Sequence, residues 1–507
     1  MHKPFKEDCN LFRVEEPYAK NNAFKKQRVH IGLLPKYERV KKLLPEPFWE
    51  GHDDYLKCYD FAWKIAFKNI KNPTIASRFK SQFIDTAFNG FSFMWDSSFM
   101  VMFGKYGVQA FNFQKTLDNF YACQHCDGFI SREIWEKREG EQFNCYDPSS
   151  TGPNILPWAE WEYYKNTGDT ERLKKIFDPL MAYHIWLRKN RTWRDGSYWT
   201  TGLGSGMDNQ PRTPQGYCAG PENGHAVWVD ACFQMIISAK VLIDIANVIG
   251  RGSETEKLKK EYDRLTEFVN KKLWSERDAF YYDLWKDEFD NDVLSGVKSV
   301  GAYWALLAGV VPPERIERFI AHLDNEKEFK RPHRVPSLSA DHPMYNRETG
   351  NYWLGGVWAP TNYMVIRGLQ RYGYHEMANE IARCSLKNVV DVYKKTGTLW
   401  ENYSPEKASQ GSPAKKDFVG WSGLFPITIL FEGVFGIEAD AQNDRVTWRV
   451  TCKEKHGIKR YPLSSGVADL ECEFVGGSPV VTISAPFLAE VDVYYQNKFL
   501  YTASSKA

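Results

Sequence analysis

Apolar residues recur at three- and four-residue steps over most of this chain, starting near residue 53. Tyr55, Tyr59, Ala62, Trp63 and Ala66 form the first such stripe, and their spacing places them on one face of a helix. The same periodicity predicts further helices, to a total of about a dozen. They lie near residues 97–106, 113–124, 157–166, 170–190, 225–249, 254–275, 299–310, 313–324, 358–372, 375–395 and 421–434.

Glycines stand where several of these stripes end. Gly104, Gly168 and Gly373 each follow a periodic run, where helices commonly stop. Asp169 then offers an oxygen that can cap the next helix. Short turns alternate with long loops rich in Gly, Pro, Asn and Trp. Paired helices connected in this way predict a mainly α fold, an α/α barrel, with function placed in the long loops.

After about residue 440 the helical period gives way to alternation. Apolar and polar residues alternate in four segments separated by Gly-rich breaks, which predicts strands. These segments are 445–451, 467–474, 479–483 and 491–495. We therefore divide the chain into a lead-in segment (1–50), a helical domain (51–438) and a small antiparallel, β-sandwich-like domain (439–507).

Charge and hydropathy narrow the class of protein. Lys and Arg number 66 against 64 Asp and Glu, a formal charge of +2, whereas nucleic-acid binders carry a basic excess. The longest apolar stretches, such as 302–311, are shorter than the roughly 20 residues of a membrane-spanning helix. The first residues lack the apolar segment of a signal peptide. We expect a soluble protein, and the compartment stays open, including a periplasmic or secreted one reached through a removed signal.

Aromatic residues are abundant, with 18 Trp, 27 Tyr and 32 Phe. Many stand beside Gly, Asp or Asn, as in 93–96, 198–199 and 351–353. Flat rings suit the faces of sugars, but large folds also bury many aromatics, so composition alone leaves carbohydrate binding open. Cys123 and Cys126 are the close pair among 10 cysteines. A zinc site would need a second such pair, so neither metal nor cofactor is expected.

Two carboxylates stand in settings suited to sugar chemistry. Asp208 lies in the Gly-rich, Pro-bounded loop 204–212, which disfavours a helix and lets a side chain project from the scaffold. Glu401 stands between Trp400 and Tyr403. One acid to protonate a leaving oxygen and one base to activate water are the groups that glycoside hydrolysis needs. On local pattern alone, a turn is the commoner role for Asp208 and an exposed loop position the commoner one for Glu401.

Several motifs occur together in one order. They are Phe93-Met-Trp-Asp-Ser-Ser98, Gly206-Met-Asp-Asn-Gln-Pro-Arg212, Gly355-Gly-Val-Trp-Ala-Pro360, Trp400-Glu-Asn-Tyr403 and Trp421-Ser-Gly-Leu424. With them, residues 55–437 resemble glycoside hydrolase family 63, which includes processing α-glucosidases and mannosylglycerate or glucosylglycerate hydrolases. They are also similar to the trehalases of family 37. The resemblance implies an (α/α)6 barrel, inversion at the anomeric carbon and no metal in the chemistry, with Asp208 as general acid and Glu401 as general base.

Other residues of these motifs, and of the loop before 158, are candidates for contacts to substrate. Each has an ordinary structural role as its alternative. Asp96 can accept from two sugar hydroxyls or cap a helix, and Arg212 can bind substrate or pair with an acid. The substrate-binding candidates are Trp95, Asp96, Asn154, Trp158, Asn209, Arg212, Trp358, Trp400, Tyr403 and Trp421.

The resemblance implies an inverting, exo-acting hydrolase of α-linked sugars, with an α-glucosidase on short oligosaccharides or glucosides as the first expectation. An α-mannoside hydrolase, a glycosylglycerate hydrolase and a trehalase-like enzyme stay open within this class. A sugar epimerase or polysaccharide lyase on the same barrel, or an inactive sugar-binding protein, are the alternatives outside it. Because Asp208 and Glu401 both match the acid and base of the family, the epimerase, lyase and inactive alternatives are disfavoured. The expected partner is the carbohydrate substrate, and one sequence does not predict the oligomeric state.

Overall fold

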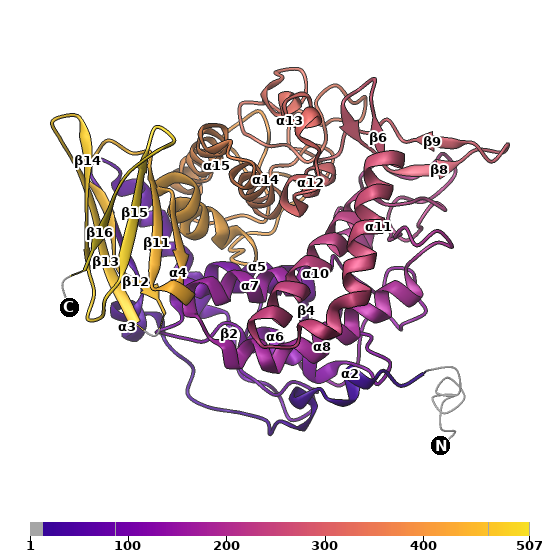
Figure 1. The fold of residues 1–507 in the computed structure, drawn as a ribbon, viewed down its shortest axis with the longest axis horizontal. Helices are drawn as coiled ribbons and strands as arrows, with labels where there is room; N and C mark the ends of the chain where they lie inside the picture. The colour runs from indigo at the N-terminus through magenta and orange to yellow at the C-terminus, as the bar shows by residue number, and fades with distance from the viewer. Residues whose placement is uncertain (1–13, 87, 465, 506–507) are drawn as a thin grey trace.

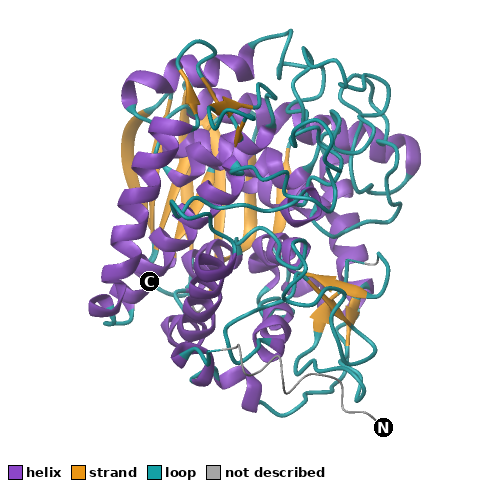
Figure 2. Ribbon diagram, turned by 90° about the vertical axis from the view of Figure 1, so that its right-hand side faces the viewer, coloured by secondary structure: helices purple, strands orange, loops and turns teal. Residues whose placement is uncertain are grey.

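The structure is a computed structural model that describes residues 14–86, 88–464 and 466–505. Residues 1–13 of the predicted lead-in segment, and 506–507 at the end of the last predicted domain, lie outside it. The helices form one body, and the C-terminal strands (yellow) stand along one side of it in Figure 1. In Figure 2 these strands (orange) lie behind the helices, and many loops (teal) gather at the upper right. The fold is therefore mainly helical with a C-terminal sheet region, as the periodicities predicted.

The longer helices follow the predicted ranges closely. They are α4 (Asp53–Lys68), α5 (Met94–Gly104), α6 (Lys115–Cys123), α7 (Leu156–Thr167), α8 (Thr170–Asn190), α10 (Val229–Val248), α11 (Glu256–Lys272), α13 (Pro313–Ile320), α14 (Ala359–Arg371) and α15 (His375–Thr396). Shorter helices are α2 (Pro17–Lys20), α3 (Tyr37–Val40), α9 (Gly202–Ser205) and α12 (Trp304–Ala308). No helix within the described ranges is both long enough and apolar enough to cross a membrane.

The helix expected at 421–434 has an unusual form. It starts as the 3-10 turn η7 (Ser422–Leu424) and continues as the π-helix η8 (Phe425–Phe435). A π-helix within a helical segment commonly stands near a functional site. Here η7 follows directly on Trp421.

Six helices of the described chain pack in a closed succession. α5 packs on α7, α7 on α10, α10 on α12, α12 on α14, α14 on η8, and η8 on α5. Other long helices pack against members of this succession: α8 and α11 on α10, α15 on α14 and η8, α4 on η8, and α6 on α5. Every residue of α5 and η8 is buried, as expected for helices with neighbours on all sides.

Local signals in the sequence explain where several helices stop and start. Gly168 ends α7 in the left-handed conformation, and Asp169 then caps α8 by accepting from the N–H of Arg172. Gly397 ends α15 in the same way, with a φ of +71°. The chain therefore leaves α15 just before Glu401, in a loop whose direction a glycine sets.

Two four-stranded sheets stand on the same side of the helical body (Figure 1), with the strand orders β1-β12-β13-β14 and β10-β11-β15-β16. Their strands are β1 (Glu46–Trp49), β10 (Ile437–Asp440), β11 (Arg445–Val450), β12 (His456–Leu463), β13 (Gly466–Val475), β14 (Ser478–Ser484), β15 (Glu490–Tyr495) and β16 (Lys498–Ser504). β11 and β15 pair in parallel, so the prediction of a purely antiparallel domain is wrong for this pair. Between β11 and β15 the chain forms β12, β13 and β14 of the other sheet. A long crossover connection of this kind allows the two strands to pair in parallel.

Strands from earlier parts of the chain extend one C-terminal sheet and form short hairpins. β1, from the lead-in segment, pairs antiparallel with β12 and so extends a C-terminal sheet. Two-stranded hairpins elsewhere are β2 (Ile70–Lys71) with β3 (Phe83–Ile84), β4 (Phe91–Phe93) with β5 (Glu133–Trp135), β6 (Trp274–Ser275) with β7 (Phe280–Tyr281), and β8 (Leu284–Lys286) with β9 (Asp292–Leu294). The β8–β9 hairpin projects on the side opposite the C-terminal sheets (Figure 1).

Candidate active site

Both carboxylates singled out in the sequence line one cavity of about 220 Å³. Asp208 and Glu401 share its wall with Asp96, Glu133 and Arg132. Six aromatic side chains line much of the remaining wall of the cavity: Phe88, Phe93, Trp95, Tyr352, Phe418 and Trp421. The cavity thus combines flat apolar surfaces with a group of acids, a combination suited to a polyhydroxy ligand.

A tight turn after α9 positions Asp208 in the wall of this cavity. Thr201 caps α9 by accepting from the N–H of Gly204, and Gly206 ends it with a φ of +76°. A side chain at Gly206 would also stand 3.3 Å from the indole of Trp95. Glycine is therefore favoured at this position for two reasons: the left-handed backbone and the close approach to an aromatic ring of the cavity.

Asp208 has the electrostatic setting of a carboxyl that keeps its proton at mildly acidic pH. Burial raises its pKa to about 6, and the nearby positive charge of Arg132 opposes that rise. Arg132 is itself held by a hydrogen bond from Nε to the main-chain oxygen of Ser149 (2.7 Å) and by an ion pair between Nη2 and Glu133 (2.7 Å). Desolvation is thus the main cause of the shift.

Glu401 is held by donors on both of its oxygens. The hydroxyl of Tyr352 donates to Oε1 at 3.1 Å, and the backbone N–H of Lys415 donates to Oε2 at 2.9 Å. Burial raises the pKa of Glu401 above its usual value, and these two hydrogen bonds oppose the rise. Since each donor favours the ionised form, the carboxylate is oriented and remains capable of accepting a proton.

Asp96 stands in the first turn of α5 and faces the same cavity. Burial, together with the charge of Glu401, raises its pKa well above the usual range. A protonated or shared carboxyl there can both donate to and accept from hydroxyl groups.

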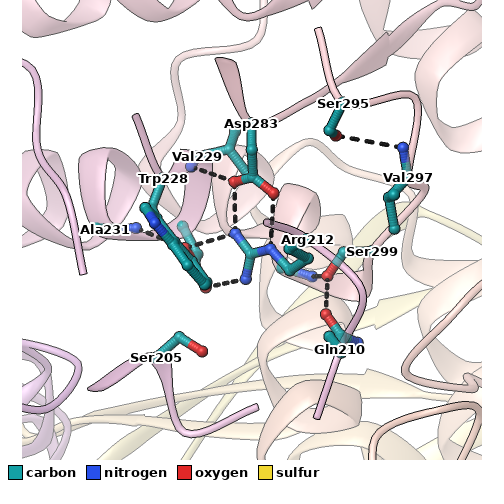
Figure 3. A network of polar contacts seen from close by, with 12 residues as sticks. Ser205, Gln210, Arg212, Trp228, Val229, Ala231, Asp283, Ser295, Val297 and Ser299 are labelled. Carbon is teal, nitrogen blue, oxygen red and sulfur yellow. Dashed lines mark hydrogen bonds and ion pairs between the residues drawn. The ribbon is translucent and has the colours of Figure 1, made fainter. Parts of the chain in front are cut away.

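Arg212 does not reach the cavity. It is fully buried and forms bidentate pairs with Asp230, at 2.7 and 2.8 Å, and with Asp283, at 2.7 Å for both bonds. Figure 3 shows its guanidinium beside Asp283, with Gln210 and Ser299 nearby. Of the two roles considered for Arg212, the structure therefore places it in an ion-pair network that anchors the Asp208 loop.

Several other candidates lie away from the cavity that holds the two carboxylates. Asn154 donates to Ser238 at 3.0 Å, inside the helical body. Trp158 stacks on Tyr363 and lines a different cavity, of about 330 Å³, between α7, α10, α14 and β11. The remaining three make contacts elsewhere: Trp358 stacks on Trp353, the half-buried Trp400 donates to the hydroxyl of Thr396, and the Tyr403 hydroxyl accepts from the Trp400 N–H.

Asn209 stands beside the cavity rather than in its wall, while Trp95, Asp96 and Trp421 line it. Tyr352, Arg132, Glu133 and Phe418 also line the cavity but were not among the residues predicted from the sequence. Tyr352 carried one signal, its place in an Asn-Tyr-Trp run outside a helical stripe. The others carried none, because an Arg-Glu pair or a single Phe is common in any sequence.

Known proteins resemble this chain over most of its length. A family model described as "Mannosylglycerate hydrolase MGH1-like glycoside hydrolase domain" matches residues 91–422. A Borreliella burgdorferi protein described as uncharacterized is 24% identical over 393 residues, which are 74% of this chain and 78% of that one. A probable mannosyl-oligosaccharide glucosidase of Schizosaccharomyces pombe is 26% identical over 54% of this chain, and the matched region is 33% of its own length.

A solved structure extends the likeness to the fold. The GH63 mannosylglycerate hydrolase of Thermus thermophilus, in complex with glucose, aligns with a TM-score of 0.59 at 19% identity. The alignment covers 73% of this chain and 99% of that one. Both carboxylates of the cavity fall within the segment matched by the family model. The protein is a glycoside hydrolase. It belongs to the MGH1-like glycoside hydrolase family, which confirms the resemblance to family 63.

Proposed function

We propose that this enzyme is an inverting, exo-acting hydrolase of α-linked sugars, with Asp208 as general acid and Glu401 as general base. The observation that carries this proposal is that both carboxylates line one small aromatic cavity. Burial raises the pKa of Asp208 to about 6, which suits a group that must hold a proton at mildly acidic pH.

The chemistry follows from the two settings. Asp208 gives its proton to the glycosidic oxygen as the bond to the anomeric carbon breaks. Glu401, held by Tyr352 and Lys415, takes a proton from a water that attacks the opposite face of the sugar. One displacement of this kind inverts the anomeric configuration.

The size and lining of the cavity support removal of one terminal sugar. About 220 Å³ is below the roughly 300–1,000 Å³ of pockets for drug-sized ligands. We propose that Trp95 and Trp421 contact the sugar ring and that Asp96 binds its hydroxyls, since all three line the cavity.

An α-glucoside is the first candidate substrate, and a glycosylglycerate is the second. The glycerate conjugate is favoured by Arg132, a cation in the cavity wall whose Nη1 has no hydrogen-bond partner among the described residues. Relatives act on both kinds of substrate by their descriptions, which name a mannosyl-oligosaccharide glucosidase and a mannosylglycerate hydrolase. An α-mannoside or trehalose would fit the same acid and base.

We also propose an (α/α)6 barrel for the helical body. The closed succession of α5, α7, α10, α12, α14 and η8 would form its inner ring. In this division residues 51–438 are the catalytic domain and 439–507 a β-sandwich-like domain, to which the segment before residue 51 adds strand β1.

Proton NMR of the anomeric region, recorded during turnover, tests the proposal. The panel contains α-linked glucosides, trehalose, mannosylglycerate and glucosylglycerate. We expect initial release of the β-anomer of the sugar from at least one of them. Initial release of the α-anomer with no β-anomer would show retention and would remove the roles given to Asp208 and Glu401.

A further inference from the structure

Tyr352 contacts the proposed general base from a backbone conformation that tyrosine rarely adopts. Its hydroxyl donates to Oε1 of Glu401 at 3.1 Å. Its φ angle is +67°, in the left-handed region that residues with bulky side chains disfavour. Such a conformation persists only where the surrounding structure holds it, so other residues must keep the hydroxyl in reach of Glu401.

Asn209 is bonded to the backbone on both sides of Tyr352. Its Nδ2 donates to the main-chain oxygen of Asn351 at 3.0 Å, and its Oδ1 accepts from the N–H of Trp353 at 3.0 Å. A side-chain amide carries a donor group and an acceptor on one carbon, which this pair of contacts requires. The amide of Asn209 therefore brackets Tyr352, which together with Asn351 (φ of +32°) forms a pair of residues with positive φ.

The residue after Asn209 makes a second connection to the same segment. Gln210 donates from Nε2 to the main-chain oxygens of Ser337, at 2.7 Å, and of Trp353, at 3.3 Å. Asp208, the proposed acid, precedes both of these amides in the chain. The loop that carries the acid thus also holds the segment that contacts the base.

We infer that Asn209 is a positioning residue for the general base: it holds Tyr352 in the left-handed conformation, and the Tyr352 hydroxyl then orients Glu401. The inference rests on the proposed roles of Asp208 and Glu401. From the sequence, Asn209 was a candidate for contact with substrate. In the structure it instead connects the loop that carries the proposed acid with the segment that contacts the proposed base.

A measurable consequence concerns the ionisation of the base. A hydrogen bond donated to the charged form of a carboxyl lowers its pKa, so the Tyr352 hydroxyl opposes the effect of burial on Glu401. Loss of this donor raises the pKa of the base. The acidic limb of the pH–rate profile then moves to higher pH.

The test compares wild type, Asn209→Ala, Tyr352→Phe and the double variant by the pH dependence of kcat/KM. Both single variants are expected to move the acidic limb up by about one pH unit and to lower kcat about tenfold or more. The double variant is expected to show the acidic limb of Tyr352→Phe alone, because Asn209 acts only through Tyr352. Additive shifts in the double variant would overturn the inference.

A control and a structural measurement separate positioning from general loosening of the loop. Asn346 lies in the same loop, but its Oδ1 accepts from the N–H of Thr349 at 2.9 Å, so Asn346→Ala should leave the acidic limb in place. An equal shift in this variant would contradict the inference.

A crystal structure of Asn209→Ala tests the same point without activity. We expect it to show Tyr352 outside hydrogen-bond reach of Glu401. A hydroxyl that stays bonded would refute the positioning role. Wild-type activity of Glu401→Gln would instead refute the proposed function, while the crystal structure would still decide what Asn209 holds.

Discussion

Trp421 donates a hydrogen bond of 2.8 Å from its indole N–H to the main-chain oxygen of Glu401. The same ring is part of the cavity wall and meets Trp358 edge to face, with ring centroids 5.6 Å apart. Trp421 immediately precedes the 3-10 turn and the π-helix. The start of this buried helical segment and the proposed base are therefore joined by one side chain.

Replacing Trp421 by Phe should lower kcat about tenfold. The change keeps an aromatic ring but leaves the buried carbonyl of Glu401 without its donor, a cost of about 1–3 kcal/mol. Steady-state kinetics on the substrate found by NMR would measure it. The matched control is Trp161→Phe, since Trp161 lines the other cavity. Equal losses in both variants would argue against a specific effect on the base.

The proposed acid and the proposed base should differ in how a reactive substrate rescues their variants. Asp208→Asn and Glu401→Gln are each expected to lose about 10²–10⁴-fold in kcat on an ordinary glycoside. An α-glycosyl fluoride needs little protonation of its leaving group, so it should restore turnover to Asp208→Asn but not to Glu401→Gln. Asp169→Asn, a change at a distant helix cap, is the control. Rescue of Glu401→Gln alone would exchange the two roles.

Activity should fall as the pH rises through about 6. Asp208 must be protonated to act as the acid, and burial raises its pKa to about 6, so kcat/KM should drop about tenfold per pH unit above it. Because the positive charge of Arg132 lowers this pKa, Arg132→Gln should move the basic limb up by as much as about one pH unit. The exposed Arg138→Gln serves as control, and an unmoved limb in Arg132→Gln would contradict this account.

Arg212 should matter for stability more than any exposed arginine. Arg212→Met leaves Asp230 and Asp283 as buried acids without their cation, which we expect to lower the free energy of unfolding by about 3–5 kcal/mol. Urea unfolding followed by fluorescence would measure this. Arg277 pairs with its neighbour Asp278 at the surface, so Arg277→Met should leave the unfolding midpoint nearly unchanged. Similar midpoints for both variants would show that the buried network contributes little.

The helices could be predicted from the sequence because their signals are local. Gly168 and Asp169 stop one helix and start the next within two residues, as the pattern indicated. The proposed acid and base residues could be selected because motifs surround them. The parallel pairing of β11 and β15 could not be predicted, since alternation shows that a segment is a strand but not which strand lies beside it.

The amino-acid sequence by itself determined the helical body, the strands after residue 440 and the two carboxylates of the cavity. Only the tertiary structure decided what Arg212, Trp158 and Tyr352 contact. Asp230 and Asp283 reach Arg212 from later parts of the chain, and no local pattern reports such a distant partner. Tyr352 reaches Glu401 through a left-handed backbone. Its own residue type disfavours that conformation, so it exists only because contacts far apart in sequence impose it.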